Sequence, residues 1–456
     1  MSTGLSTGLT AEFMAELASG NGPELLAPAG TLRNLDYALA YGADAVYAGI
    51  PRYSLRVRNN DFTGKNLITG IRAAHRLGRR FYLAVNLMPH GAKLRTFLAD
   101  LRPILTPDDP AYMPDALIMS DPGLIDLVRE HWSDIPVHLS VQANTTNAAT
   151  VRFWQRQGLR RVILSRELSL AEIAEIRQQC PGIELEVFVH GALCIAYSGR
   201  CLLSGYFNHR DANQGSCTNA CRWEYRLGEI PGTAETEALQ PQPRSERSYV
   251  LEEAQRPGEA LPIFEDEQGT YILNAKDLRA VEHVAELIAI GVDSLKIEGR
   301  TKSHYYCARA TQVYRQAIDG ARAGLPFDKR WLEELEGLAN RGYTSGFYQR
   351  HAPEDLQNYR DGVSRNQRAI FVGDVIGYDA ASSQAEVAVR NRFARGDQLQ
   401  LLTPAGNHSL VCEQLWDRHG QPLEVAPGSG WIVRLGLPKM PASADLSRFG
   451  LLTREL

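Results

Sequence analysis

Eight short apolar runs, separated by helical patterns, constrain the fold of this chain more than any other feature. The runs begin at Glu24, Asp44, Arg80, Ala116, Val137, Arg161, Glu184 and Ser294. Most are nearly continuous hydrophobic stretches, which are typical of strands buried on both faces of a parallel sheet. Several of the helical patterns between them stop at a glycine, as at Gly42 and Gly291. Eight strand–helix units predict a TIM-like (β/α)8 barrel, with a doubly wound open sheet as the alternative.

Changes in composition divide the chain into a tail, a barrel and a second domain. Residues 1–20 begin with a run rich in Ser, Thr and Gly and are predicted to be a flexible tail. The barrel is predicted over residues 21–360. It carries an insertion of about 224–269, after the seventh strand, that is rich in Pro, Glu, Gln and Ser and is predicted to be a partly disordered loop. Five short strand patterns within 361–456 predict a small antiparallel β-barrel.

The bulk composition argues against two classes of protein. The net charge is −4, so nucleic-acid binding requires a local basic patch rather than a global positive field. No apolar run approaches the ~18 residues of a membrane span. The first residues also lack the basic and apolar regions of a secretory signal. We therefore expect a cytoplasmic protein with no membrane partner, in which thiols stay reduced.

Polar side chains follow several of the apolar runs, where a barrel places its active site. Arg166 follows the sixth run, His190 lies at the end of the seventh, and Glu298 and Arg300 end the eighth. His190 and Glu298 are candidate catalytic residues, because an imidazole or a carboxylate can transfer a proton. A packed, hydrogen-bonded histidine is the alternative for His190, and strand ends are more polar than strand middles even without a function.

Four of the seven cysteines lie within 28 residues: Cys194, Cys201, Cys217 and Cys221. Such a group of thiolates indicates a metal centre. Only the last pair has the spacing of a zinc knuckle, and a CxxxCxxC radical-SAM motif lacks its third cysteine. A four-thiolate [4Fe–4S] cluster tolerates irregular spacing when loops supply its ligands. The pattern favours an iron–sulfur cluster and leaves zinc and non-metal roles open.

The run EVFVHGALCIAYSGRCLLSG resembles the signature of the peptidase U32 family. ELLAPAG, YGADAVYAG and SLKIEGR fit the same family, and HLSVQAN, VILSRELSL and NQGSCTNACRWEY resemble its tRNA-modifying members. The resemblance implies hydroxylation of the wobble uridine of certain tRNAs to 5-hydroxyuridine, dependent on prephenate. It also implies that the four grouped cysteines are the ligands of an iron–sulfur cluster.

This implied chemistry assigns roles to two sets of arginines. Prephenate carries two carboxylates, which favour guanidinium groups, and the candidates to bind it are Arg56, Arg58, Arg166, Arg200 and Arg300. Some of these five are expected to form plain salt bridges instead. In the second domain, Arg390, Arg392 and Arg395 are candidates to contact the tRNA, with a solvated surface as the alternative. Tyr47, Tyr53 and Tyr197 are candidate platforms for a base flipped out of the anticodon loop, with core packing as the favoured alternative for Tyr47.

Two other functions stay open at this point. The family name implies a peptidase, and collagenase activity has been attributed to some members, although the sequence holds neither an HExxH helix nor a GxSxG elbow. The chain is alternatively a non-catalytic iron–sulfur or tRNA-binding partner of a separate hydroxylase. Hydroxylation requires a redox step, so an electron donor is a further expected partner.

Overall fold

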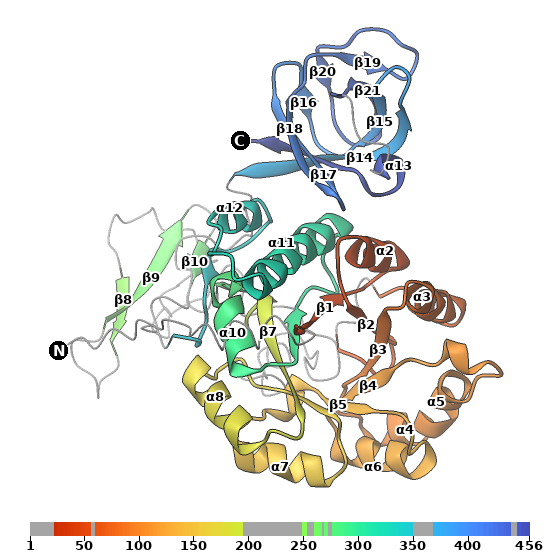
Figure 1. The fold of residues 1–456 in the computed structure, drawn as a ribbon, viewed down its shortest axis with the longest axis vertical. Coiled ribbons are helices and arrows are strands. Elements are labelled where there is room, and N and C mark those ends of the chain that lie inside the picture. The colour runs from red at the N-terminus through yellow and green to blue at the C-terminus, as the bar shows by residue number, and fades with distance from the viewer. Residues whose placement is uncertain are drawn as a thin grey trace, which may run out of the picture.

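The chain folds as a barrel surrounded by helices, with a second, mostly β domain packed against one side of it (Figure 1). The computed structural model describes residues 22–55, 60–194, 249–252, 260–266, 269–271, 276–349, 368–438 and 445–456.

Eight parallel strands form the wall of the barrel. In order around the wall they are β1 (Glu24–Pro28), β2 (Ala45–Gly49), β3 (Arg80–Val85), β4 (Ala116–Met119), β5 (Val137–Leu139), β6 (Arg161–Ile163), β7 (Glu184–Ala192) and β12 (Ser294–Ile297). The barrel closes because β12 pairs with both neighbours, so that Ser294 lies opposite Glu24 on one side and Glu186 on the other. The eight apolar runs are these eight strands. The predicted barrel is confirmed, and the open-sheet alternative is wrong.

Helices cover the outside of the barrel. They are α2 (Leu32–Ala40), α3 (Lys65–Arg76), α4 (Gly91–Leu94), α5 (Phe97–Leu105), α6 (Pro122–His131), α7 (Ala148–Arg156), α8 (Leu170–Gln179), α10 (Val284–Ile290), α11 (His304–Arg322) and α12 (Arg330–Glu336). The predicted glycine stops are confirmed, since Gly42 and Gly291 both have positive φ. Within the described ranges, none of the helices combines the length and apolar character needed to cross a bilayer.

Local signals fix where these helices begin. The side chains of five polar residues accept a hydrogen bond from a backbone N–H of the first turn: Thr31, Asp121, Asn147, Ser169 and Ser303. Ser169 and Glu172 form a complete capping box at the start of α8. All five caps lie between a barrel strand and the helix that follows it, so the first turns of α2, α6, α7, α8 and α11 lie toward the carboxyl ends of the strands before them.

The segment that follows β7 contains strands that the sequence did not reveal. β8 (Tyr249–Glu252), β9 (Ala260–Asp266) and β10 (Gly269–Tyr271) form a three-stranded antiparallel sheet. This pairing corrects the loop prediction for this part of the insertion, where polar composition concealed short strands that need each other to form. β11 (Asp277–Arg279) then pairs with the end of β7, and β13 (Tyr343–Thr344) pairs with β11. The rest of the insertion, and residues 1–20 of the predicted tail, lie outside the described residues.

The second domain is built on a seven-stranded antiparallel sheet that curls around its own core (Figure 1). Its strands are β14 (Ala369–Asp379), β15 (Gln384–Val389), β17 (Gln398–Thr403), β18 (Gly406–Val411), β19 (Leu415–Asp417), β21 (Ile432–Gly436) and β22 (Leu451–Glu455), with a separate pair, β16 (Phe393–Ala394) and β20 (Val425–Ala426), and one short helix, α13 (Leu446–Phe449). Four of the five predicted patterns are single strands. The pattern from His408 divides into β18 and β19. The structure adds β22, which lies between β14 and β17, strands that are distant from it in the sequence.

The two domains share a mixed apolar and polar interface. Tyr305 of α11 stacks on Phe371 of β14, with ring centroids 4.8 Å apart. The Tyr41 hydroxyl after α2 donates a hydrogen bond of 2.8 Å to the carbonyl of Phe449. Gln312 donates to the carbonyl of Thr403 at 3.0 Å. Because these contacts run along α2 and α11, the second domain is fixed against the side of the barrel where β1 and β12 meet.

The central position of β22 generates a stability prediction. Leu452 is fully buried in the core of the second domain, whereas Glu455 on the same strand is exposed. Leu452→Ala is expected to lower the free energy of unfolding by about 2–5 kcal/mol, because it leaves a cavity in a closed core. Glu455→Ala is the matched control and is expected to change the free energy of unfolding by no more than about 0.5 kcal/mol. Urea unfolding followed by tryptophan fluorescence measures both. Equal effects would contradict the assignment of β22 to the core.

Candidate functional site

A network of polar side chains lines the rim of the barrel at the carboxyl ends of β3, β4 and β5. The Asn86 amide donates a hydrogen bond to the Ser140 hydroxyl at 3.2 Å, and the Ser120 hydroxyl donates to the Asn86 carbonyl at 3.1 Å. The Asn86 side-chain oxygen accepts from the backbone N–H of Leu55 at 3.2 Å. These bonds connect three strand ends to the loop that follows β2, so this part of the mouth is held in one arrangement.

Arg166, Glu298 and Tyr47 meet on the other side of the mouth. An Arg166 guanidinium nitrogen lies 3.6 Å from a Glu298 carboxylate oxygen, and both side chains are largely buried. The guanidinium also stacks on Phe188, at 3.9 Å from the ring centroid. The Tyr47 hydroxyl donates to the Ile297 carbonyl at 3.0 Å and lies 3.5 Å from Glu298. The sequence predicted Arg166 and Glu298 separately, and the structure brings them together as a pair, as the salt-bridge alternative anticipated.

Arg300 is buried beside this pair and anchors the loop after β2. Its guanidinium donates a hydrogen bond of 2.5 Å to the carbonyl of Leu55. The close packing requires a glycine at position 49, because a Cβ there would lie 2.2 Å from the Arg300 guanidinium and 2.2 Å from the Ser54 hydroxyl. Arg56 and Arg58 follow Leu55 directly but lie outside the described residues, as does Arg200. Of the five arginines predicted to bind a carboxylate ligand, the two that the structure describes lie together at the mouth.

A column of charged side chains fills the barrel beneath the mouth. The Lys296 ammonium donates to Glu186 at 2.7 Å and lies 4.4 Å from the centroid of the Tyr47 ring. Arg161 donates to the other Glu186 oxygen at 3.0 Å and to Glu24 at 2.6 Å. All four ionic groups are almost completely buried. The column therefore runs from the amino end of β1 and β6 up to the residues that support the mouth.

Ionic partners offset the unfavourable burial of the charged side chains in the column. Burial alone would raise the pKa of Glu24, but attraction to Arg161 and Arg80 outweighs it and holds that pKa below its usual range. Burial lowers the pKa of Lys296, and the adjacent Glu186 opposes this shift. Burying charges is unfavourable unless each is paired and hydrogen-bonded, and this condition is met along the column. The inside of the barrel is therefore an ionic network as well as an apolar core.

Cys194 lies two residues beyond the end of β7, at the mouth, and its thiol is exposed. The turn toward it passes close to the eighth strand: a Cβ at Gly191 would lie 2.5 Å from the Glu298 carbonyl, and Gly191 has φ of 106°. An exposed thiol at this place fits a metal ligand. Cys201, Cys217 and Cys221 lie outside the described residues, so the complete ligand set stays a prediction. Within the described ranges no group of three or more His, Cys, Asp or Glu side chains has metal-binding geometry.

His190 packs behind the barrel wall. A bulge between β7 and β12 places it opposite Ile297. Its ring lies among those of Tyr306, Tyr314 and Tyr343, with centroids 5.5–5.7 Å away. Burial lowers the pKa of His190 to about 3, so the imidazole is neutral at physiological pH. This position favours the packing alternative over proton transfer at the mouth.

The three arginines predicted to contact RNA divide into two environments. Arg390 binds Asp374 at the domain interface, with 2.9 Å between the paired atoms. Arg392 is exposed in the same turn after β15. Arg395 binds Glu424 at 2.8 Å and donates to the Glu413 carbonyl. Arg395 is thus engaged within its own domain, whereas Arg390 lies next to the barrel.

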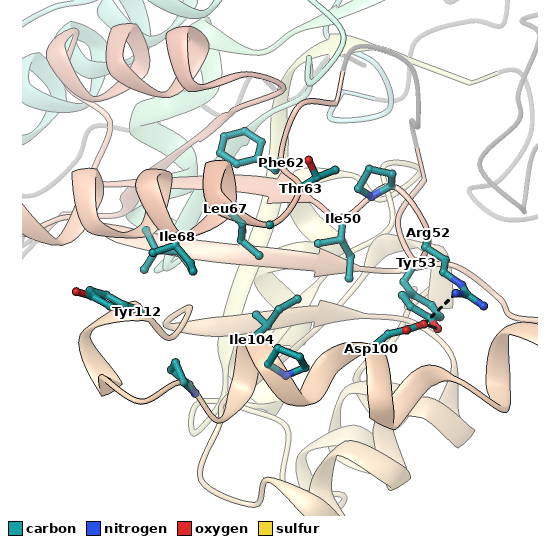
Figure 2. Close-up of a pocket in the computed structure, with 15 residues that line it drawn as sticks. Ile50, Arg52, Tyr53, Phe62, Thr63, Leu67, Ile68, Asp100, Ile104 and Tyr112 are labelled. Atoms are coloured by element: carbon teal, nitrogen blue, oxygen red, sulfur yellow. Dashed lines mark hydrogen bonds and ion pairs between the residues drawn. The ribbon is translucent and has the colours of Figure 1, made fainter.

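A separate apolar cleft of about 380 Å³ lies outside the barrel, between α3 and α5 (Figure 2). Ile50, Leu67 and Ile104 project into it. At one end, the Tyr53 hydroxyl donates to Asp100 at 2.5 Å, and Arg52 lies 3.2 Å from the same carboxylate. This arrangement directs Tyr53 toward α5 rather than toward the mouth. Tyr47 is buried in the column, and Tyr197 lies outside the described residues.

Comparison with known proteins identifies the family. Residues 30–358 match the model of peptidase family U32, and residues 367–448 match the model of the C-terminal domain of that family. This chain belongs to peptidase family U32. Both domains of the U32 fold are therefore present, and their matched ranges agree with the barrel and the second domain described above.

Several U32 relatives align over nearly the whole chain. A protein of Escherichia coli strain K12, named tRNA hydroxylation protein P, is 58% identical over 91% of this chain and 94% of its own length. A protein of the same name from Haemophilus influenzae is 55% identical over 95% of this chain and 96% of its own length. The tRNA hydroxylation protein P1 of Bacillus subtilis is 34% identical over 94% of this chain and 95% of its own length.

Sequence reasoning missed the charge column, although a signal for it was present. Glu24, Arg161, Glu186 and Lys296 all lie inside apolar strands, where an isolated charge is unfavourable. Opposite charges in several buried strands therefore indicate pairing inside a barrel. The partners are not readable, because they depend on how the strands are staggered around the wall.

Two glutamates of β7 provide a matched test of the column. Glu186 is fully buried between Arg161 and Lys296, whereas Glu184 also binds Arg161 but is partly exposed. Glu186→Gln is expected to lower the free energy of unfolding by about 3–5 kcal/mol, because it leaves buried cations without their carboxylate. Glu184→Gln is expected to lower the free energy of unfolding by about 1 kcal/mol or less, because water replaces the lost contact. Equilibrium unfolding at pH 7 distinguishes the two. Similar losses would contradict a buried column.

Proposed function

We propose that this protein acts in the hydroxylation of tRNA, converting the wobble uridine of certain tRNAs to 5-hydroxyuridine in a prephenate-dependent reaction in the cytoplasm. The observation that carries the proposal is 58% identity, over nearly the full length of both chains, to a protein named for tRNA hydroxylation. The match includes the barrel mouth and the second domain, so it extends over every part that the proposal uses.

The charges at the mouth support a small anionic ligand. Arg166 pairs with the Glu298 carboxylate, and Arg300 lies 5.7 Å from the centroid of the ring of Tyr47, whose hydroxyl is 3.5 Å from the same carboxylate. Among the two arginines and this carboxylate the net charge is positive, which suits a dicarboxylate such as prephenate. In this proposal the stacking on Phe188 holds the Arg166 guanidinium at the mouth, and the bond from Arg300 to Leu55 positions the loop that continues to Arg56 and Arg58.

The exposed thiol at the same mouth supports a cofactor close to that ligand. In the proposal, Cys194, Cys201, Cys217 and Cys221 hold an iron–sulfur cluster, which supplies electron transfer when bound. The approach of Gly191 to Glu298 keeps the start of the cysteine segment beside the arginine pair. Glu298 is held by Arg166 and Tyr47, where it can accept a proton from a group bound at the mouth.

A thiol peptidase is the alternative that the family name suggests. Such an enzyme needs an imidazole beside the nucleophilic thiolate. His190 is the histidine nearest to Cys194 in the sequence, and it packs among three tyrosine rings. A non-catalytic partner of a separate hydroxylase, with its own electron donor, uses the same mouth and is distinguished by experiment.

Nucleoside mass spectrometry of tRNA tests the proposal. Cells lacking the gene are complemented with wild type, Cys194→Ala or Cys412→Ala and grown without oxygen, to minimise oxygen-dependent hydroxylation. Cys412 is the matched control, since it is a buried cysteine in the second domain, away from the mouth. We expect wild type and Cys412→Ala to restore 5-hydroxyuridine and its derivatives. Cells with Cys194→Ala are expected to contain at least tenfold less of these nucleosides.

Two results would contradict the proposal. Unchanged nucleosides in the deletion strain would exclude this tRNA substrate. Full restoration by Cys194→Ala would remove this cysteine from the reaction. Activity of the purified protein on a uridine-34 transcript, measured with prephenate and a reductant, then separates a hydroxylase from its non-catalytic partner.

A further inference from the structure

Asp374 holds two arginines from different domains at one point of the interface. Arg33, on the first turn of α2, lies 2.7 Å from one carboxylate oxygen, and Arg390, after β15, lies 2.9 Å from the other. His304, the first residue of α11, lies 2.6 Å from the oxygen that binds Arg33. Asp374 is buried, whereas the arginine side chains are each 44% exposed. The carboxylate is therefore an internal anchor that presents two cations at the surface.

The charges at this point do not cancel. One carboxylate faces two arginines, which leaves a surplus positive charge. Burial would raise the pKa of Asp374, but the His304 hydrogen bond and the arginine charges hold it below its usual range. Within the described part of the chain, Asp374 is the only hydrogen-bond partner of the Arg390 guanidinium. The Arg390 side chain is 44% exposed, so an external anion can reach its guanidinium.

Arg33 and Arg390 lie at the mouth side of the barrel. α2 follows β1 and α11 follows β12, so their first turns lie next to the carboxyl ends of those strands. The Asn34 side chain, one residue after Arg33, donates to the carbonyl of Lys302 in the loop that leaves β12. Glu298 and Arg300 lie in the same loop. A polymer that reaches the mouth can therefore extend past both arginines.

We propose that Arg33 and Arg390 together form a phosphate-binding site for the tRNA backbone, spanning the two domains beside the barrel mouth. The inference rests on the proposed function and adds Arg33, a barrel residue that the sequence did not single out. Arginine is suited to this role, because its planar guanidinium can bind a carboxylate on one edge and a phosphate on another. Such contacts position the polymer without reading its sequence.

The opposite end of the barrel provides a matched control. Asp44, which precedes β2, also binds two arginines: Arg79 at 2.7 Å and Arg315 at 2.9 Å. Arg79 is 40% exposed, close to the value for Arg33 and Arg390. This site differs in net charge, because Arg315 also binds Asp319 at 2.7 Å and the two arginines there face two carboxylates. It lies at the amino ends of the strands, away from the mouth, so Arg79 is a control for the loss of an exposed, aspartate-bound arginine elsewhere on the surface. Tyr41→Phe is a second control, since it removes a hydrogen bond of the domain interface without changing charge.

The experiment measures the dissociation constant of the full-length protein for a transcribed tRNA with uridine at the wobble position, at several salt concentrations. Arg33→Gln and Arg390→Gln are each expected to weaken binding about three- to tenfold, and the double variant is expected to reduce the salt-dependence slope by about 1–2. Arg79→Gln and Tyr41→Phe are expected to bind like wild type. Arg33→Lys and Arg390→Lys keep the charge and should therefore retain the salt-dependence slope of wild type, which keeps the test decisive if a glutamine variant loosens the domain contact.

Each contrary result has a distinct meaning. A double variant that binds as tightly as Arg79→Gln would overturn the phosphate site and leave the proposed function intact. An equal loss in Tyr41→Phe would also overturn it, because interface integrity rather than charge would then control binding. A wild-type protein that binds no tRNA would overturn the proposed function itself, and this inference with it.

Discussion

The contact of Glu186 with both Arg161 and Lys296 is the interaction on which the rest of the barrel depends. β7 supplies the carboxylate, β6 the arginine and β12 the lysine, so one buried group connects three strands, including the one that closes the barrel. Buried ions are tolerated only when they are paired and hydrogen-bonded. A different stagger of the strands would separate these ions and leave a buried charge unpaired, and the stagger sets the height of each side chain at the mouth.

Contacts with that column position the side chains of the mouth. Lys296 lies beneath Tyr47, and Tyr47 contacts Glu298, which pairs with Arg166. On the outer side, β12 continues into the loop that supports Arg300 and the start of α11, and α11 carries much of the interface with the second domain. The same strand thus connects the inside of the barrel, the candidate site and the domain that we propose to contact tRNA.

The fold was largely predictable from the sequence, whereas the site was predictable only in part. Strands buried on both faces give continuous apolar runs, so all eight barrel strands were found. The strand β22 was missed, because it is short and pairs with β14 and β17, which are distant in the sequence. Polar strand ends correctly indicated Arg166, Glu298 and Arg300 at the mouth. The two alternatives for His190 were not separable from the sequence, because its place depends on a one-residue bulge in β7 that turns it to the outer face. The pairing of Arg33 with Asp374 joins residues 341 positions apart and left no local pattern.

The central claim is that the barrel mouth carries the chemistry, and Arg166 tests it most directly. Arg177 is a suitable control, since it is a partly buried arginine that binds Asp293 just before the amino end of β12. The amount of 5-hydroxyuridine in tRNA is measured in deletion cells that express Arg166→Gln or Arg177→Gln at equal levels. The account predicts a loss of tenfold or more for Arg166→Gln and near-normal levels for Arg177→Gln. Wild-type levels with Arg166→Gln would place the chemistry elsewhere in the molecule.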